Sequence, residues 1–286
     1  MKDPDPDVTR AVWEGKVPMR ITMDPGEAIA LTSRAPAEAH FLLAPRCSYI
    51  PLLVQQVRQF FVDHAGLSFA GDDSEIWFES QGVPLKWHYP IGLLYDLHVA
   101  PVCSRSGEPP PLPWEVTVRF RGFPADKLIR VQSSMTVDAP QDHFMAMIKE
   151  ADYLRSGSIK KVMSLSKQDQ TALWSGISSN DYEGFWAVNT RLITTDGAPK
   201  SVPVRIYVVG RSVVQEPVAP FESSSPANTL SDALARLLPS LFQPSTPTAS
   251  PPPSPLTLLH GVPAPLDAPL LWLSQNCAYP DNFLHI

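Results

Sequence analysis

Hydrophobic and polar residues follow a regular order over the first 124 residues. Alternation and short apolar runs predict strands, which are MRITM (19–23), HFLLAPR (40–46), IWFES (76–80), VPLKWH (83–88) and WEVTVRFRGF (114–123). An apolar stripe predicts a helix over 49–63. PIGLLYDL (90–97) begins with proline, which favours a short helix, and a Pro/Ser-rich loop is expected over 101–113. This order of elements is that of a ubiquitin-like β-grasp domain.

Helical spacing also marks the start and the middle of the chain. TRAVWEG (9–15) predicts a short first helix, with Asp7 or Thr9 as its cap. The middle predicts three helices, over 142–158, 164–174 and 180–193. In the second of them Ser166 is followed three residues later by Asp169, which indicates a relative of the capping box.

After residue 200 the order of the first part returns. The expected elements are a hairpin, a helix, a strand, a short helix and a last strand, at 202–218, 230–242, 256–261, 269–276 and 282–286. Two Pro/Ser-rich stretches, 219–228 and 243–255, flank the main helix. Their composition is typical of flexible segments, and the second favours a polyproline II conformation.

One short motif occurs at the same place in both parts. GVPLKWHYPIGLL (82–94) and GVPAPLDAPLLWL (261–273) share a glycine, a valine, two prolines and two apolar positions at equal spacing. Chance matching among 32 prolines is the alternative, and the matched order of elements makes it the weaker one. The motif is expected to form the fourth strand and the short helix of a β-grasp domain.

The predicted fold class is therefore α+β, with two ubiquitin-like β-grasp domains flanking a helix-rich domain. The N-terminal helix is expected within 1–15, and the first ubiquitin-like domain within 16–124. The helix-rich domain is expected within 138–197, and the second ubiquitin-like domain within 200–286, where it carries the Pro/Ser-rich insert 243–255.

Composition narrows the functional class only slightly. Hydrophobic residues make up 44% and charged residues 18%, as in an ordinary globular protein. The net charge of −6 argues against a general nucleic-acid binder, because such proteins neutralise phosphates. No stretch approaches the roughly 18 apolar residues of a membrane span, and the first residues lack the pattern of a secretion signal. Three widely spaced cysteines favour reduced thiols in the cytosol.

Several longer motifs resemble those of one known family. They are WFESQGVPLKWHYPIGLLYDL (77–97), KEADYL (149–154), KVMSLSKQD (161–169), PVRIY (203–207) and YPDNFLHI (279–286). All of them are similar to autophagy protein 5, and the similarity runs from about Trp13 to Ile286. The family is known as two ubiquitin-like domains flanking a helix-rich domain, which agrees with the predicted order of elements.

The resemblance implies a role that composition does not. Members of the family receive the ubiquitin-like modifier autophagy protein 12 and bind a helix of autophagy protein 16. The resulting ligase-like complex works with the conjugating enzyme of autophagy protein 8, and it promotes transfer of that modifier to phosphatidylethanolamine. The implied location is cytoplasmic, with peripheral contact at the preautophagosomal (phagophore) membrane.

The sequence contains no recognised catalytic motif, whether a nucleophile elbow, a phosphate-binding loop or a paired metal-ligand spacing. We therefore expect no cofactor and a non-catalytic subunit that acts by proximity and orientation. Two alternatives stay open. One is a cysteine-dependent transferase that uses Cys47, Cys103 or Cys277, and the other is a helix-binding adaptor unrelated to conjugation.

The family's acceptor lysine has no counterpart at its expected position. Placing the family pattern on the KEAD stretch puts that position at Val137, and no lysine occurs from Leu128 to Ile148. Lys149 or Lys127 could substitute, a mutation could have removed the lysine, or the modifier could bind without a covalent bond. We rank Lys149 first among the candidate acceptors, although a lysine in this helix is also expected simply to face solvent.

Arg46 matches a family motif position, and the resemblance implies pairing with a carboxylate on the incoming partner helix. The equal alternative is a surface arginine that caps the helix 49–63. Lys160, Lys161 and Lys167 could approach anionic lipid, where each basic residue contributes up to about 1 kcal/mol. A solvated helix surface is the more common role of such lysines.

Overall fold

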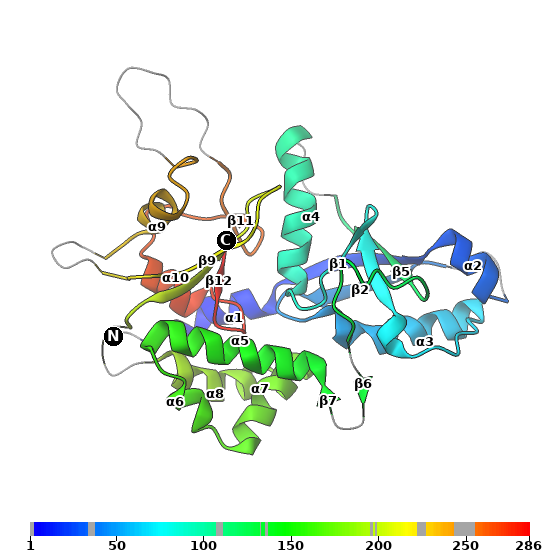
Figure 1. The fold of residues 1–286 in the computed structure, drawn as a ribbon, viewed down its shortest axis with the longest axis horizontal. Coiled ribbons are helices and arrows are strands. Elements are labelled where there is room, and N and C mark those ends of the chain that lie inside the picture. The colour runs from blue at the N-terminus through cyan, green and yellow to red at the C-terminus, as the bar shows by residue number, and fades with distance from the viewer. Residues whose placement is uncertain are drawn as a thin grey trace. The chain divides into compact units, whose positions relative to one another are not determined.

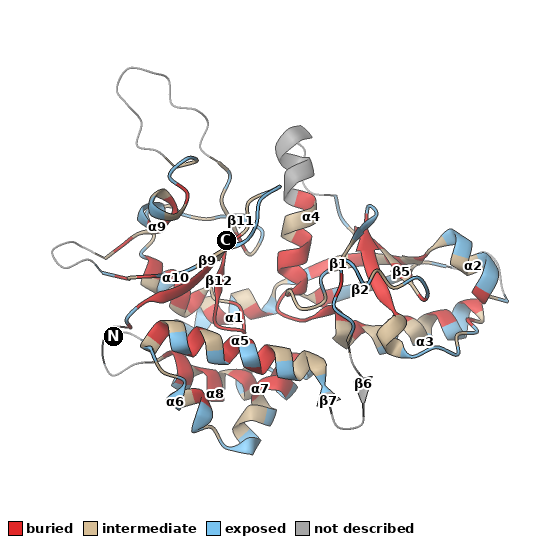
Figure 2. Ribbon diagram, in the orientation of Figure 1, coloured by how far each residue is buried: buried red, intermediate tan, exposed pale blue. Residues whose placement is uncertain are grey.

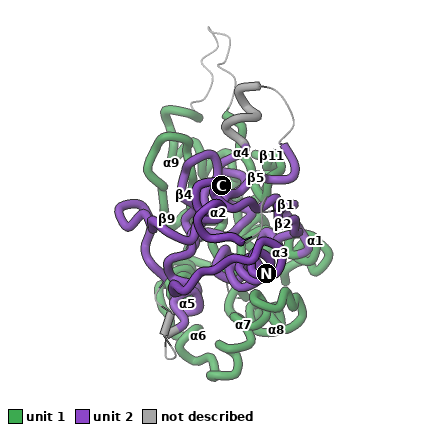
Figure 3. Tube along the Cα trace, turned by 90° about the vertical axis from the view of Figure 1, so that its right-hand side faces the viewer, with its two compact units in different colours: residues 1–13, 145–286 green, residues 14–144 purple. Residues whose placement is uncertain are grey.

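The computed structural model describes residues 3–33, 38–106, 111–131, 133–134, 137–194, 197, 199–221, 227–242 and 255–286. For residues 100–106, 133, 134 and 137 it describes the backbone only. The chain forms two compact units, one of residues 14–144 and the other of residues 1–13 and 145–286 (Figure 3). Residues 243–254 of the predicted insert lie outside the described residues.

The unit 14–144 contains a five-stranded sheet in the order β2–β1–β5–β3–β4 (Figure 1). Its strands are β1 (Lys16–Met23), β2 (His40–Pro45), β3 (Trp77–Ser80), β4 (Val83–Pro84) and β5 (Trp114–Arg119). β1 pairs with β5 in parallel and with β2 in antiparallel fashion, and β3 is antiparallel to both β4 and β5. This arrangement confirms the predicted ubiquitin-like β-grasp fold.

Alternation along β1 explains why one face of the sheet forms the core. Val17, Met19, Ile21 and Met23 are buried, and the residues between them are more exposed (Figure 2). The helical segments are α2 (Pro25–Leu31), η1 (Ile50–Leu53), α3 (Val54–Ala65), η2 (Asp73–Glu75) and α4 (Ile91–Ser106). The fully buried Phe61 of α3 belongs to the same apolar cluster as the inward side chains of β1.

Two local predictions in this unit were wrong, and one helix was missed. The missed helix is α2, for which Asp24 accepts a hydrogen bond from the N–H of Glu27 and so caps it. The strand predicted over 83–88 ends at Pro84, because residues 86–89 form a turn. Helix α4 continues through Pro101 to Ser106, since a proline removes one helical hydrogen bond without necessarily ending the helix.

The second unit begins with a helical bundle. Its helices are α1 (Pro6–Glu14), α5 (Ala139–Ser156, which starts in the first unit), α6 (Lys160–Met163), α7 (Lys167–Ser179) and α8 (Tyr182–Ile193). The capping box of α7 is confirmed, because Ser166 accepts the N–H of Asp169 and the Asp169 side chain accepts the N–H of Ser166. The predicted caps of α1 were wrong: Asp7 and Thr9 lie inside that helix.

Helix α1 packs on α8, far from it in sequence. The indole of Trp13 lies 4.9 Å from the ring of Phe185 between centroids, and the hydroxyl oxygens of Thr9 and Tyr182 are 2.7 Å apart. Arg10 forms an ion pair with Glu183 at the surface. The first helix is therefore part of the bundle in the second unit, and it is separate in sequence from the rest of that unit.

A second, smaller β-grasp sheet completes this unit, in the strand order β12–β8–β9. Its elements are β8 (Val202–Ile206), β9 (Val214–Val218), α9 (Leu230–Leu237), the hairpin of β10 (Leu258–Leu259) and β11 (Val262–Pro263), α10 (Leu270–Asn276) and β12 (Leu284–His285). β12 runs parallel to β8, as β5 does to β1. An apolar cluster that includes Leu230, Leu234 and Leu270 fills the core.

The repeated sequence motif forms the same structure twice. Gln81–Gly82 has φ values of 51° and 77°, and His260–Gly261 has 52° and 79°. Two successive positive φ values indicate a type I′ hairpin turn. In each copy the first residue of the helix after the hairpin donates its N–H to a backbone carbonyl that lies before the main helix. Ile91 donates to the carbonyl of Ser48 and Leu270 to that of Asn228, each at 2.8 Å.

Candidate functional site

The position expected to carry the acceptor lysine lies directly before helix α5. Val137 starts the strand β7 (Val137–Asp138), which pairs with β6 (Ser133–Ser134) in a two-stranded hairpin. The carboxylate of Asp138 accepts the N–H of Gln141 at 3.2 Å and so begins the helix. The position carries a valine and not an amine.

Both substitute lysines are exposed. Lys149 lies on α5, and Lys127 lies in the turn that follows Pro124, where its N–H donates to the Pro124 carbonyl at 3.0 Å. Each ammonium group is therefore open to an incoming thioester. The structure gives no geometric reason to prefer one, so the ranking of Lys149 first stays a prediction.

Arg46 is held inside its own unit. Its side chain is about one-tenth exposed and forms an ion pair with Asp96, and it also donates to the Gly92 carbonyl at 3.2 Å. The guanidinium lies 5.9 Å from the centre of the Tyr95 ring. The interpretation of Arg46 as a surface cap of the helix 49–63 was therefore wrong. Its role in binding a partner helix stays a prediction.

The three lysines considered for lipid contact differ in their surroundings. Lys160 and Lys167 are exposed, whereas the ammonium of Lys161 donates to the carbonyls of Thr194 and Leu192. Those carbonyls lie at the C-terminal end of α8, where a cation satisfies backbone acceptors. The ammonium of Lys161 is thus already engaged in hydrogen bonds within the bundle.

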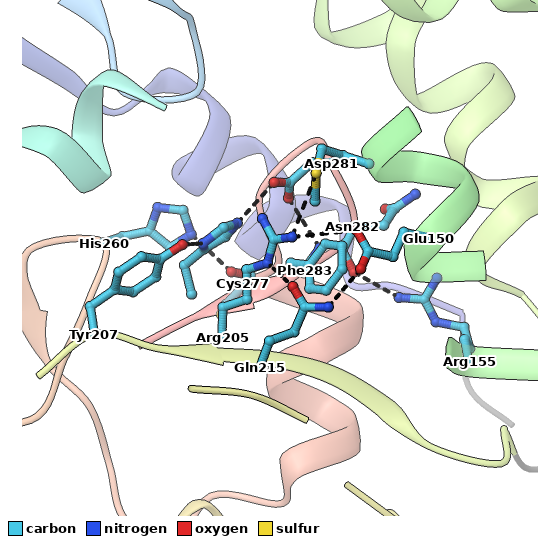
Figure 4. Close-up of polar contacts among 12 residues, drawn as sticks. Glu150, Arg155, Arg205, Tyr207, Gln215, His260, Cys277, Asp281, Asn282 and Phe283 are labelled. Atoms are coloured by element: carbon cyan, nitrogen blue, oxygen red, sulfur yellow. Dashed lines mark hydrogen bonds and ion pairs between the residues drawn. The ribbon is translucent and has the colours of Figure 1, made fainter. Parts of the chain in front are cut away.

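The most developed polar cluster surrounds the C-terminal segment 279–286 (Figure 4). Nε2 of His285 lies 2.9 Å from Oδ2 of Asp281, and Nδ1 of His285 lies 2.8 Å from the hydroxyl of Tyr207. Burial by itself would raise the pKa of the Asp281 carboxyl. The nearby His285, together with hydrogen bonds from His285 and from the Phe283 N–H, holds that pKa below its usual value.

Arg205 connects this segment to helix α5. Its guanidinium carbon lies 4.2 Å from the centre of the Phe283 ring, a cation–π arrangement. It donates to Gln215 at 2.6 Å and forms an ion pair with Glu150 at 3.4 Å, and Gln215 also donates to Glu150 at 2.6 Å (Figure 4). One arginine thus joins a strand of the sheet, the C-terminal segment and the bundle.

A second buried arginine holds the backbone of the same segment. Arg155 donates to the Asn282 carbonyl at 3.1 Å, and the Asn282 amide donates to Asn189 of α8 at 2.8 Å. Burial lowers the pKa of Arg155 to about 10, and burial raises the pKa of the adjacent Asp152. Several buried polar groups therefore hold the segment in place between the bundle and the second sheet.

This cluster has the groups of an acid–base relay but not the access. The side chains of His285 and Asp281 are 1% and 4% exposed, so no substrate reaches them in this structure. Among the described residues no group of three or more His, Cys, Asp or Glu is arranged to hold a metal ion. The arrangement is suited to fixing the fold of this unit.

The cysteines give no support to a thioester mechanism. Cys47 is buried, and burial raises the pKa of the Cys277 thiol to about 11, whereas reactive cysteines have a lowered pKa. The side chain of Cys103 lies outside the described residues. Within the described ranges, no helix combines the length and the hydropathy that a membrane span needs.

Sequence reasoning missed the cluster around Arg205 and His285. A signal was present, because Asn282 and His285 are polar residues in the segment expected to be the last strand, and Asp281 directly precedes it. Polar groups on a core strand require buried partners. Their partners lie on α5, α8 and β8. These elements are far away in the sequence, so a single sequence does not reveal the pairing.

Comparison with known families matches all three parts of the chain. Models described as "Autophagy protein ATG5, UblA domain", "alpha-helical bundle region" and "UblB domain" match residues 12–120, 137–195 and 201–286. Autophagy protein 5 of Aspergillus clavatus is 32% identical over 318 residues, covering 98% of this chain and 95% of that protein. The Drosophila melanogaster protein of the same name is 32% identical over 286 residues, covering 99% and 96%.

A solved structure supports the fold. The crystal structure of Kluyveromyces marxianus Atg5 superposes with a TM-score of 0.75 and covers 98% of both chains. Its sequence identity with this chain is 21%, so the likeness bears on the fold alone. It agrees with two β-grasp sheets and a helical bundle in one chain.

Proposed function

Because the chain belongs to the autophagy protein 5 family, and so has a role in autophagy, we propose that it is a non-catalytic scaffold of the autophagy conjugation machinery. It binds or is conjugated to the ubiquitin-like autophagy protein 12 and binds a helix of autophagy protein 16. The complex then promotes lipidation of autophagy protein 8 by its conjugating enzyme. It does so at the preautophagosomal membrane, reached from the cytoplasm by peripheral contact.

The observation that carries this proposal is the match of all three family models in order along the chain. The described cysteines support the non-catalytic part. A thioester-forming cysteine needs a thiolate, whereas Cys47 is buried and partial burial raises the pKa of the Cys277 thiol. A scaffold accelerates the reaction by holding the loaded enzyme near its acceptor, which requires rigid domains and no nucleophile.

The form of attachment to the modifier is the specific part of the proposal. Val137 cannot form an isopeptide bond, because its side chain has no amine. Lys149 is the first candidate acceptor and Lys127 the second. Both are exposed, and an exposed lysine needs no activation when the conjugating enzyme carries the thioester. Non-covalent binding of the folded modifier is the alternative, and the experiment below separates the two.

The experiment combines the chain with its own autophagy protein 12, the activating and conjugating enzymes and ATP. A band shift on a denaturing gel, mapped by mass spectrometry, identifies the acceptor lysine. The matched variants are Lys149→Arg and Lys127→Arg, which keep the charge and remove the acceptor. Omitting ATP is the control for each.

Two further outcomes have a defined meaning. If no shifted band forms but the two proteins elute together in gel filtration, the attachment is non-covalent and the scaffold role stands. If they neither react nor elute together, the proposed partnership is wrong. An added helix of autophagy protein 16 tests the second partner in the same gel filtration, and the variant Arg46→Gln tests the predicted contact.

A further inference from the structure

A pocket lies inside the unit 14–144, between the β-grasp fold and the chain that leads out of it. We call residues 121–131 the connector. The pocket has a volume of about 360 Å³ and is lined by the starts of η1, α3 and η2, the strand β3, the connector and the start of α5. Its aromatic lining residues are Trp77, Phe78, Trp87 and Phe123. None of the residues around Arg205 and His285 takes part in it.

Hydrogen bonds and ion pairs hold the connector side of this pocket in place. The indole N–H of Trp87 donates to the Ile129 carbonyl at 2.7 Å, and that of Trp77 donates to the Arg121 carbonyl at 2.8 Å. Arg130 pairs with Glu75 and lies 4.6 Å from the centre of the Phe123 ring. Ligand sites in proteins are usually preformed in this way.

The lining is apolar with a few polar groups, as in small-molecule sites. Among the described lining residues, the charged ones are Asp73 and Asp138, and none is basic. Asp73 is already paired with Arg58, whose Nη1 lies 2.8 Å from Oδ1. Asp138 is exposed and accepts only the N–H of Gln141, with no cation beside it among the described residues. The pocket therefore carries one uncompensated carboxylate at its rim.

We propose that this pocket binds a compact aromatic amine. The ring would lie among the aromatic lining, and the ammonium group would face Asp138. A volume of about 360 Å³ is at the lower end of the range of roughly 300–1,000 Å³ for ligand pockets, which selects a compact molecule. A carboxylate on the same ring is disfavoured, because it would face Asp138 without a basic partner.

Binding has a consequence for the chain around the pocket. Phe123, Leu128 and Val131 of the connector form one wall, and Asp138 and Pro140 form another. A bound ligand contacts both walls, so it stabilises the connector against the β-grasp core. The site is separate from the scaffold role proposed above, and the test does not depend on that role.

The test uses the full chain and two matched probes, tryptamine and indole-3-acetate, which carry the same ring with opposite charges. Methyl NMR follows the δ-methyl groups of Ile50 and Ile76, both of which line the pocket, with Ile177 of α7, which does not line it, as the reference. We expect tryptamine to shift the two pocket methyls, and indole-3-acetate to bind at least tenfold more weakly.

Two variants and a control complete the experiment. Val54→Phe fills the pocket from the first residue of α3 and should weaken tryptamine binding at least tenfold, whereas Val62→Phe on the exposed side of the same helix should not. Asp138→Asn keeps an acceptor for the helix start but should abolish the preference for tryptamine. Equal binding of both probes to the unmodified chain overturns the proposal, and so do shifts at Ile177 alone. Both outcomes are measured on the unmodified chain, so the test holds even if Val54→Phe fails to fold.

Discussion

The imidazole of His285 lies between Asp281 and Tyr207, with its Nε2 2.9 Å from a carboxylate oxygen and its Nδ1 2.8 Å from a hydroxyl. A carboxylate only accepts hydrogen bonds, so Nε2 carries a proton. In the neutral imidazole Nδ1 then accepts from the Tyr207 hydroxyl. The buried chain Tyr207–His285–Asp281 is thus satisfied at every position, and it fixes the C-terminal segment against β8.

Replacing the buried carboxylate should destabilise the second unit in a pH-dependent way. The pKa of Asp281 is lowered in the folded state, so its contribution is present above its unfolded value of 3.8 and is lost as the pH falls through the lower folded pKa. We expect Asp281→Asn to lower the unfolding free energy at pH 7 by about 1.5–3 kcal/mol, the range for hydrogen bonds to charged groups. Below pH 3.8 the difference from the unmodified chain should shrink. Urea denaturation at pH 7, 5, 4 and 3 measures it.

Asp267→Asn is the matched control, because Asp267 is an exposed aspartate of the same unit. It should change the unfolding free energy by less than about 0.5 kcal/mol at pH 7. A constant difference between Asp281→Asn and the unmodified chain from pH 7 to pH 3 would mean that the carboxylate contributes nothing through its charge.

The two hairpin glycines should respond alike to a side chain. Gly82 has φ = 77° and Gly261 has φ = 79°, where an L residue other than glycine is strained. No atom lies within 4 Å of a Cβ built on Gly82, so the cost of Gly82→Ala is conformational alone. We expect that variant, and Gly261→Ala, to lose about 1–2 kcal/mol each in urea denaturation.

Gly82→Asn separates strain from other causes. Asparagine enters the left-handed region more readily than alanine, so it should recover much of the lost stability. An asparagine variant as unstable as the alanine variant would contradict the assignment of the loss to backbone conformation.

Much of the fold could be predicted because its signals are local. Alternation predicted β1 and β5, an apolar stripe predicted α3, and the repeated Gly-Val-Pro motif predicted both hairpins and the start of the helix after each. Turn glycines and capping residues act within a few positions along the chain, so one sequence reveals them.

The rest depends on partners that are distant in sequence. Arg46 was expected at a surface, and its carboxylate partner Asp96 lies fifty positions away on α4. The ion pair between Arg205 of β8 and Glu150 of α5 was not predicted either, because the two residues lie on elements far apart in the sequence. Pairing of charged side chains depends on tertiary position, which periodicity does not specify. The pocket behind the connector likewise arises from several segments at once.

The half-buried thiol of Cys277 should react slowly. Its pKa is raised from 9.0 to about 11, so at pH 8 about one molecule in a thousand carries the thiolate, against roughly a tenth for an unshifted cysteine. We expect alkylation by iodoacetamide to be roughly 100-fold slower in the native chain than in urea, measured by mass spectrometry over time. Equal rates would reopen the cysteine-dependent mechanism at this residue.

An amine placed before α5 should make residue 137 an acceptor for the modifier. In Val137→Lys the new lysine stands at the start of β7, at the position that the resemblance to the family implies for the acceptor. With autophagy protein 12, its enzymes and ATP, this variant should give a shifted band on a denaturing gel, and mass spectrometry should place the bond at residue 137. In the proposed function the conjugating enzyme supplies the activated thioester, so an acceptor position needs only a correctly placed amine.

Ile129→Lys on the connector is the matched control, because Ile129 is 69% exposed and lies in the same unit. A conjugate on both variants would mean that the enzymes modify any exposed lysine and that residue 137 has no special position. A conjugate on neither, while the proteins still elute together, would mean that binding positions the modifier's terminus away from residue 137. Attachment at residue 137 alone is the result that requires a specific geometry, since the two lysines differ only in where the chain presents them.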